Sequence, residues 1–211
     1  MTTLTALKAE VAVDLRRSDL TTNIATAISA AIRHWQTERF YFNESRLSTF
    51  ATVSTQSLYD VDDDADIPKW IEIDYVKLAD SDGQIYGLDR ISPEEMESLL
   101  YTGAASGRPN SYSYFEESFR LHPVPDAVYT VRPVGLIRKA EPASDGEANN
   151  VWMTEAYDLI RLDAEERIYT NVLVDIERAA LVRNGKMEAL RMLYGASSKK
   201  TATGQIVATQ F

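Results

Sequence analysis

The segment Thr21–Thr55, TTNIATAISAAIRHWQTERFYFNESRLSTFATVST, contains the change of pattern that decides the fold. In its first half, apolar residues lie three and four positions apart, which predicts an amphipathic helix capped by Thr21 or Thr22. These apolar residues are Ile24, Ala27, Ile28, Ala31, Ile32 and Trp35. The later part, Leu47–Thr55, is rich in threonine, valine and phenylalanine, which favours a β-strand. The chain is therefore expected to change from helix to strand within this segment.

The middle of the chain continues the strand pattern. Trp70–Leu78 alternates apolar with acidic residues, and the turn sequence Asp80–Gly83 predicts a hairpin with Gln84–Leu88. Further strands are predicted at Ser113–Leu121 and Ala127–Arg138. One short helix is expected between the hairpin and these later strands, because a serine, a proline and two glutamates form a capping sequence there.

Helical spacing also marks both ends of the chain. The pattern predicts helices at Thr3–Arg17 and Thr154–Asn171, and another that Asp175 caps and Gly195 ends. The last segment, Ala196–Phe211, has mostly small and polar residues, so we expect an extended tail that is flexible in the free protein.

Together these patterns predict an α+β fold that is mainly helical. We expect a helical bundle built from both chain ends, an inserted antiparallel β region and an extended C-terminal tail. The expected domains are 1–45 for the N-terminal helices, 46–138 for the β region with its short helix, 139–195 for the C-terminal helices, and 196–211 for the tail.

Composition excludes several classes of function. The 211 residues carry a formal net charge of −10, which disfavours sequence-independent binding of nucleic acid by the whole surface. The chain has no cysteine, which excludes disulfides, thiolate metal sites and cysteine nucleophiles. No apolar run approaches the ~20 residues that a membrane helix needs, and no signal peptide is visible at Met1–Thr5. The chain is therefore expected to stay in the cytoplasm of the cell that makes it.

Histidine and aspartate patterns do not favour a catalytic or metal site. Only two histidines occur, His34 and His122, and no nucleophile-elbow sequence accompanies them. In the acidic run Asp60–Asp66, alternate aspartates have the spacing that opens a calcium loop. The pattern fails at Ile67 and Ile73, where such a loop requires glycine and glutamate, so it indicates a solvated acidic turn. We expect no catalytic residue, cofactor or metal ion.

Paired carboxylates keep one enzymatic alternative open. Glu94 with Glu95, or Glu116 with Glu117, has the residue types of a glycan hydrolase acting on a cell wall. Adjacent side chains point in different directions, however, so adjacency alone does not indicate a shared site. A small-ligand or peptide-binding module is a third hypothesis.

Aromatic residues gather in two stretches, around Trp35–Phe42 and around Tyr112–Phe119. Most of them are expected to pack in the core, and any left exposed would be candidates for a protein interface. The candidate subunit or partner contacts are Trp35, Arg39, Tyr41, Tyr112 and Tyr114.

Three stretches resemble the head-to-tail adaptor, or connector, proteins of tailed bacteriophages, specifically the portal adaptors of podovirus type. The first is Ile28–Glu44, ISAAIRHWQTERFYFNE, a helix running into an arginine and an aromatic run. The second is the turn Leu121–Asp126, LHPVPD, followed by Tyr129, and the third is Trp152–Ile160, WMTEAYDLI. The resemblance extends from about Thr21 to Tyr194, and none of its motifs is catalytic.

The resemblance implies a structural virion protein rather than an enzyme. It implies a ring, of twelve copies, under the portal protein, which joins the head to a tail or nozzle protein and lets DNA pass without specific binding. It places the protein at the head-tail junction of the virion, with no membrane contact. It also implies that the C-terminal tail grips the portal, through Gln205, Ile206, Val207 and Phe211. Some relatives are associated with cell-wall hydrolysis, which keeps a tail-associated glycan hydrolase as the alternative.

Overall fold

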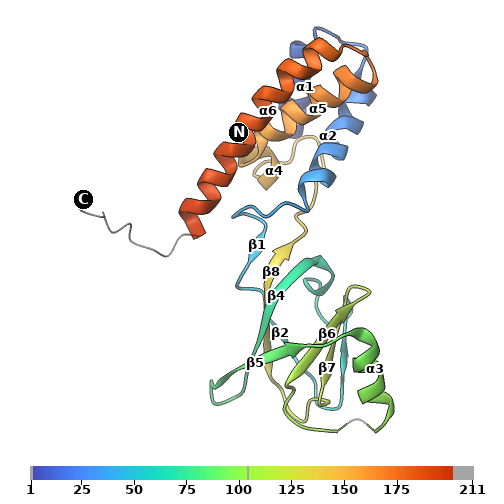
Figure 1. Cartoon of the computed structure of the whole chain (residues 1–211), viewed down its shortest axis with the longest axis vertical. Coiled ribbons are helices and arrows are strands. Elements are labelled where there is room, and N and C mark those ends of the chain that lie inside the picture. Colours follow the sequence, from blue (N-terminus) through green and yellow to red (C-terminus); the bar gives the residue numbers. More distant parts are fainter. Residues whose placement is uncertain (1, 104, 202–211) are drawn as a thin grey trace, which may run out of the picture. The chain divides into compact units, whose positions relative to one another are not determined.

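The computed structural model describes residues 2–103 and 105–201 and divides the chain into two compact units. The helical unit contains the residues before Asn43 and after Arg138, and the sheet unit is Asn43–Arg138 (Figure 1). Each unit has its own hydrophobic core. No helix in these described ranges is long and apolar enough to cross a lipid bilayer.

Five helices form the helical unit in the part of the chain that is described. They are α1 (Leu4–Leu15), α2 (Thr21–Trp35), α4 (Val151–Thr154), α5 (Tyr157–Asn171) and α6 (Ile176–Thr201). α5 packs against both α2 and α6, and α1 packs against α2 and α5. The apolar stripe predicted for α2 is buried along its whole length.

Capping explains where two of these helices begin. The side chain of Thr3 accepts a hydrogen bond from the backbone N–H of Ala6 at the start of α1. Asn150 accepts from Trp152 and begins the short helix α4, which the sequence did not predict, and the helix predicted from Thr154 begins at Tyr157 as α5. α2 begins at Thr21 without a side-chain cap, which differs from the capping predicted from its threonines.

The predicted stop at Gly195 is wrong, because α6 continues to Thr201. A glycine inside a helix costs only about 1 kcal/mol relative to alanine, too little to end a helix that packs along its length. The hydroxyl of Ser197 donates to the carbonyl of Leu193 and follows the helical path. Residues 196–201 of the expected tail are therefore helical, and residues 202–211 lie outside the described residues.

Within the described residues, the sheet unit contains one curled sheet, one α-helix and one short 3-10 helix. The strands are β1 (Glu44–Ser45), β2 (Phe50–Ala51), β3 (Leu58–Tyr59), β4 (Trp70–Ala79), β5 (Ile85–Arg90), β6 (Ser111–Phe115), β7 (Ser118–His122) and β8 (Thr130–Ile137). The short 3-10 helix η1 (Ile67–Lys69) precedes β4, and α3 (Pro93–Tyr101) follows β5. The strand order is β1-β8-β4-β5-β6-β7-β3, and β2 pairs with β8 beside β1.

The prediction of a mainly helical bundle with an antiparallel insertion is wrong. The fold contains a large mixed sheet of eight strands, in which β5 and β6 are parallel. The helix predicted after the hairpin supplies the reason, since α3 returns the chain to the end of the sheet from which β5 started. Ser92 caps this helix by accepting from the backbone N–H of Glu95, with Pro93 next to it.

The segment predicted as one strand, Ser113–Leu121, is a hairpin of two strands, β6 and β7. Glu116 and Glu117 form its turn, with φ of 50° and 58°. Two successive residues with positive φ form the turn that suits the twist of a hairpin, but glycine or asparagine usually occupies it. The sequence therefore gave no turn signal at this point.

β4 curls around β8 at a glycine. The register between β4 and β8 shifts twice, between Trp70 and Glu72 and between Ile73 and Tyr75. Gly135 of β8 lies opposite these shifts, and a Cβ atom there would be 2.2 Å from the carbonyl oxygen of Glu72. Only glycine permits two backbones to approach this closely.

Replacement of Gly135 by alanine should therefore destabilise the protein by about 2 kcal/mol or more, because the new methyl group forces β4 away from β8. Thermal or urea unfolding measures this loss. The control is Gly87→Ala in β5, where a Cβ atom meets nothing within 4 Å. Equal stability of the two variants would contradict the interpretation.

Candidate assembly surfaces

Several large apolar side chains are exposed at the turn between α5 and α6 and along α6. Val174 and Leu181 are each 72% exposed, and the others are Val172, Ile176, Met187 and Met192. Single exposed apolar residues are common on soluble proteins, but Val172, Val174 and Ile176 follow one another within one turn. This turn is a candidate contact for another protein.

Val174 is held in an unfavourable backbone conformation at this turn. Its φ is 53°, in the left-handed region that β-branched residues rarely adopt. The neighbouring Asp175 donates its backbone N–H to the carbonyl of Tyr169 and fixes the turn. The strain costs about 1–3 kcal/mol and buys no burial of the valine side chain within the chain itself.

A cluster of charges around the buried carboxylates of Asp163 and Glu166 joins α5 to α6. The Lys186 ammonium of α6 lies 2.9 Å from Asp163 and 2.5 Å from Glu166, both on α5. Arg167 pairs with Asp163 at 2.9 Å, and Arg183 pairs with Glu166 at 2.7 Å. Burial alone raises the pKa of Glu166, but hydrogen bonds from Lys186 and Arg183 outweigh it and hold the pKa below its usual value. Each carboxylate thus has two cationic partners, and Lys186 is shared between them, so the cluster fixes how the two helices face each other.

A third buried carboxylate on α5, Glu165, is less well compensated. Burial raises its pKa to about 8, although Arg161 lies 3.2 Å away and opposes the shift. The carboxylate of Asp14 raises the pKa of Glu165 further and competes for Arg161, which it approaches at 2.6 Å. No sequence pattern predicted that this charged face of α5 is buried.

The candidate contact residues from the aromatic stretch of the helical unit differ in exposure. Trp35 is only 6% exposed and belongs to the core, whereas Arg39 and Tyr41 are half-buried. The Tyr41 hydroxyl donates to Glu155, and the Lys200 ammonium lies 3.5 Å from the centre of the Tyr41 ring. Burial, together with the Glu155 carboxylate, raises the pKa of Tyr41 to about 12. Tyr41 is therefore held in place beside the last turns of α6.

The candidates in the sheet unit are largely internal. Tyr112 is 1% exposed, and the hydroxyl of the half-buried Tyr114 donates to the carbonyl of Ile67 at 3.0 Å. Neither Trp35 nor Tyr112 offers its ring to a partner in this conformation. Tyr101, at the end of α3, is 94% exposed and was not among the predicted contact residues.

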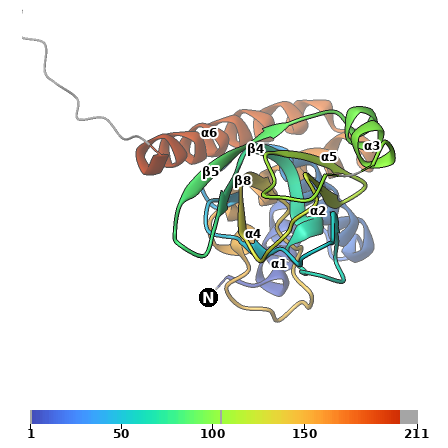
Figure 2. The ribbon, with the colours of Figure 1, turned by 90° about the horizontal axis from the view of Figure 1, so that it is seen from below.

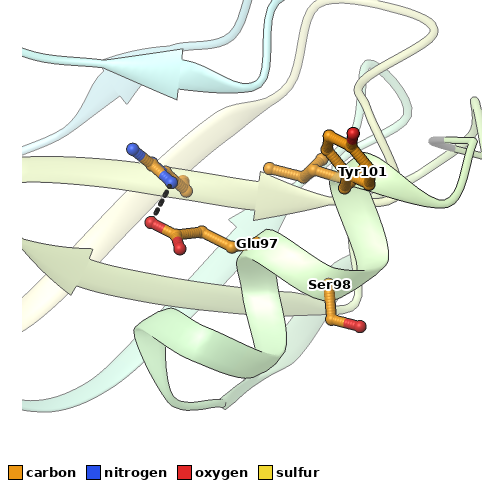
Figure 3. A pocket seen from close by; sticks show the side chains of 5 residues that line it. Glu97, Ser98 and Tyr101 are labelled. Carbon is orange, nitrogen blue, oxygen red and sulfur yellow. Dashed lines mark hydrogen bonds and ion pairs between the residues drawn. The ribbon is translucent and has the colours of Figure 1, made fainter.

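Tyr101 borders a shallow pocket between α3 and β7, shown in Figure 3. The lining residues are Glu97, Ser98, Leu100, Tyr101 and Arg120. Glu97 is the carboxylate of this lining, and it pairs with the Arg120 guanidinium at 3.2 Å. The pocket thus offers a partly apolar surface for contact rather than an acid and a base that converge on a substrate.

The four glutamates considered as residues of a glycan hydrolase are exposed, and they lie in the first turn of a helix and in a hairpin turn. Glu94 and Glu95 lie in the first turn of α3, where acidic residues favour the helix dipole. Glu116 and Glu117 form the β6–β7 turn, and Glu117 lies 3.9 Å from Arg138.

The acidic run at Asp60–Asp66 folds as a set of turns. Asp60, Asp63 and Asp64 each accept a backbone N–H from a nearby residue, and Asp66 pairs with Lys69. Among the described residues, no group of three or more histidine, cysteine, aspartate or glutamate side chains is placed to hold a metal ion.

A family model described as SU10 adaptor protein matches residues 2–208. The chain belongs to this family. The match includes both units and most of the segment after Thr201, and the family is one of structural phage adaptors. No curated protein sequence matches the adaptor significantly.

Removal of Lys186, the central cation of the cluster between α5 and α6, should lower the stability of the protein strongly. Lys186→Met should lower the free energy of unfolding by about 3 kcal/mol, because Asp163 and Glu166 lose a shared partner inside the protein. The control is Lys8→Met, which breaks the more exposed pair with Asp145 and should cost less than about 1 kcal/mol. Urea unfolding of the two variants compares these losses, and equal losses would contradict the assignment.

The raised pKa of Glu165 should make the stability of the protein depend on pH. Its pKa is near 4.5 in the unfolded chain and about 8 in the folded one. Between these values only the folded state keeps the proton, so the free energy of unfolding should fall as the pH rises through this range. Glu165→Gln, which stays neutral, should reduce that fall in urea unfolding across the range. The exposed Glu177→Gln should leave it unchanged, and an unaltered profile for Glu165→Gln would refute the assignment.

Proposed function

We propose that twelve copies of the adaptor form a ring at the head-tail junction of the virion. In this proposal the ring binds the portal protein on one side and a tail or nozzle protein on the other. The observation that carries the proposal is the family match over residues 2–208. The exposed apolar residues around Val174 on the helical unit and Tyr101 on the sheet unit are suited to two different protein contacts. A ring requires such unlike surfaces, since each copy contacts its two neighbours through different faces.

The ring would let DNA pass through without binding it specifically. The chain carries 32 acidic against 22 basic residues, so a channel lined by this protein would repel phosphates. The protein would be made in the host cytoplasm and would require neither a cofactor nor a membrane.

The C-terminal tail is the proposed portal-binding segment. Gln205, Ile206, Val207 and Phe211 are the proposed contacts, and all four lie outside the described residues. The support is compositional, because this stretch combines three large apolar residues with no charge. Arg39, Tyr41 and Tyr114 remain proposed contacts between subunits or with a partner, since each is only half-buried.

The ring itself is tested by native mass spectrometry of the full chain, alone and mixed with assembled portal rings. We expect a complex of twelve adaptor chains per portal ring. A saturated mixture in which the adaptor stays monomeric would refute the proposed function.

Deletion of residues 202–211 should leave the helical and sheet units folded but abolish the complex with the portal. The cut preserves α6, which ends at Thr201. Co-sedimentation with portal rings measures binding, and circular dichroism checks the fold. A control that replaces 205–211 with a glycine-serine sequence of equal length should also fail to bind. Retained binding by either variant would exclude the tail as the portal contact.

A further inference from the structure

In one part of the sheet, both outer strands have an edge that pairs with no further strand among the described residues, and the two edges lie in the same rows of paired residues. There the strand order is β2-β8-β4-β5, with Ala51 paired to Thr130, Thr130 to Ala79, and Ala79 to Ile85. The next row continues this order from Phe50 through Val131 and Leu78 to Tyr86. This part of the sheet is thus a ribbon of four antiparallel strands that ends in β2 on one side and β5 on the other.

The first half of β5 has unused backbone groups on its outer side. Hydrogen bonding alternates along an antiparallel pair, and the bond from Asp80 to Gln84 fixes the phase of the β4–β5 hairpin. The backbone groups of Ile85 and Gly87 therefore point away from β4. β6 does not cover them, because it pairs with β5 only at Asp89 and Arg90. Figures 1 and 2 both show the turn of this hairpin on the side of the sheet unit opposite α3.

β2 presents a matching edge. The backbone N–H of Thr52 donates to Tyr129 at 2.8 Å, so the same alternation turns the backbone groups of Ala51 away from β8. In the described part of the chain no strand pairs with β2 on that outer side. Val53, two positions further, is already occupied by the Tyr59 hydroxyl.

Neither edge carries the features that usually prevent strands from pairing between molecules. Leu47–Leu58 and Gly83–Leu88 contain no charged residue and no proline. The two edges also have the same buried and exposed faces of the sheet. Phe50 is buried and Tyr86 half-buried on one face, while Ala51 and Ile85 are exposed on the other. A sheet continued from β5 of one copy to β2 of the next would keep these faces aligned. Since β2 and β5 run in opposite directions, the added pair would be antiparallel.

We propose that neighbouring copies in the ring join edge to edge, with β5 of one copy paired to β2 of the next. The register places Ile85 opposite Ala51 and Gly87 opposite Thr49, which uses the outward backbone groups of β5 and avoids Val53. The partner is a second copy of this chain, because both edges belong to the same unit and match in direction, face and charge. This inference rests on the proposed ring and names its subunit contact.

Cysteine pairs test the contact directly in a chain that has no cysteine of its own. Within one copy, residues 51 and 85 are three strand spacings apart, about 14 Å, which is too far for a disulfide. Oxidation of portal-bound full-length A51C/I85C should therefore give a ladder of covalent multimers on a denaturing gel. A51C/T130C is the matched control, since these residues are paired within one copy and should give only a crosslinked monomer.

Removal of one backbone N–H from the edge of β5 gives a second test of the contact. Ile85→Pro removes an N–H that the hairpin does not use, so the monomer should keep its circular dichroism while ring formation falls at least tenfold. Ile85→Val should form rings normally.

Four outcomes would overturn the inference. Rings that form without a ladder, or rings that form equally well with Ile85→Pro, would refute the edge contact and leave the proposed function standing. Covalent dimers from the single I85C variant would show that two β5 edges pair with each other instead. Absence of rings even with the portal would refute the proposed function, and the edge contact with it.

Discussion

The pairing of the first and last strands of the sheet unit is the constraint on which the rest of the molecule depends. β1 lies antiparallel to the end of β8, and the backbone N–H of Ile137 donates to Asn43 at 2.8 Å. The chain therefore enters and leaves the sheet unit at neighbouring positions, as an insertion into a helical sequence requires. The same strand, β8, pairs with β4 on its other side, and Gly135 allows the two backbones to come close enough for β4 to curl. One strand thus closes the insertion and shapes its sheet.

Where the sequence pattern is regular, it predicted the structure well. The helical spacing of Ile24 to Trp35 corresponds to α2, because burial on one face imposes that period. The alternation of Trp70 to Leu78 predicted that β4 is a strand, but not which of its residues are buried, because two register shifts interrupt the period. The pattern did not predict that β6 runs parallel to β5, since alternation describes a strand but not its neighbour. It also missed the turn at Glu116 and the continuation of α6 through Gly195, because the usual residue preferences are broken at both. Packing against other elements overrides such local preferences.

The candidate surfaces were predicted less well than the fold. An aromatic residue in a sequence carries no mark of which side of a strand or helix faces a partner, so Trp35 and Tyr112 were chosen although both are buried. Tyr101 and Val174 escaped notice because exposure depends on the tertiary arrangement. The family resemblance was confirmed over nearly the whole chain, since its motifs are packing sequences that mark a fold. The sequence marks an unpaired strand edge only by the absence of charged residues. That absence can be interpreted only when the strand order of the sheet is known.

The buried charges between α5 and α6 have a mechanical consequence. A shift of α6 by one turn along α5 would remove Lys186 from both of its carboxylates inside the protein. The cluster works as a pin and α6 as a stiff rod of 26 residues, about 39 Å long. The end of α6 at Thr201 is thus held at a fixed distance from the first turn of the helix, so α6 sets a length as a ruler does.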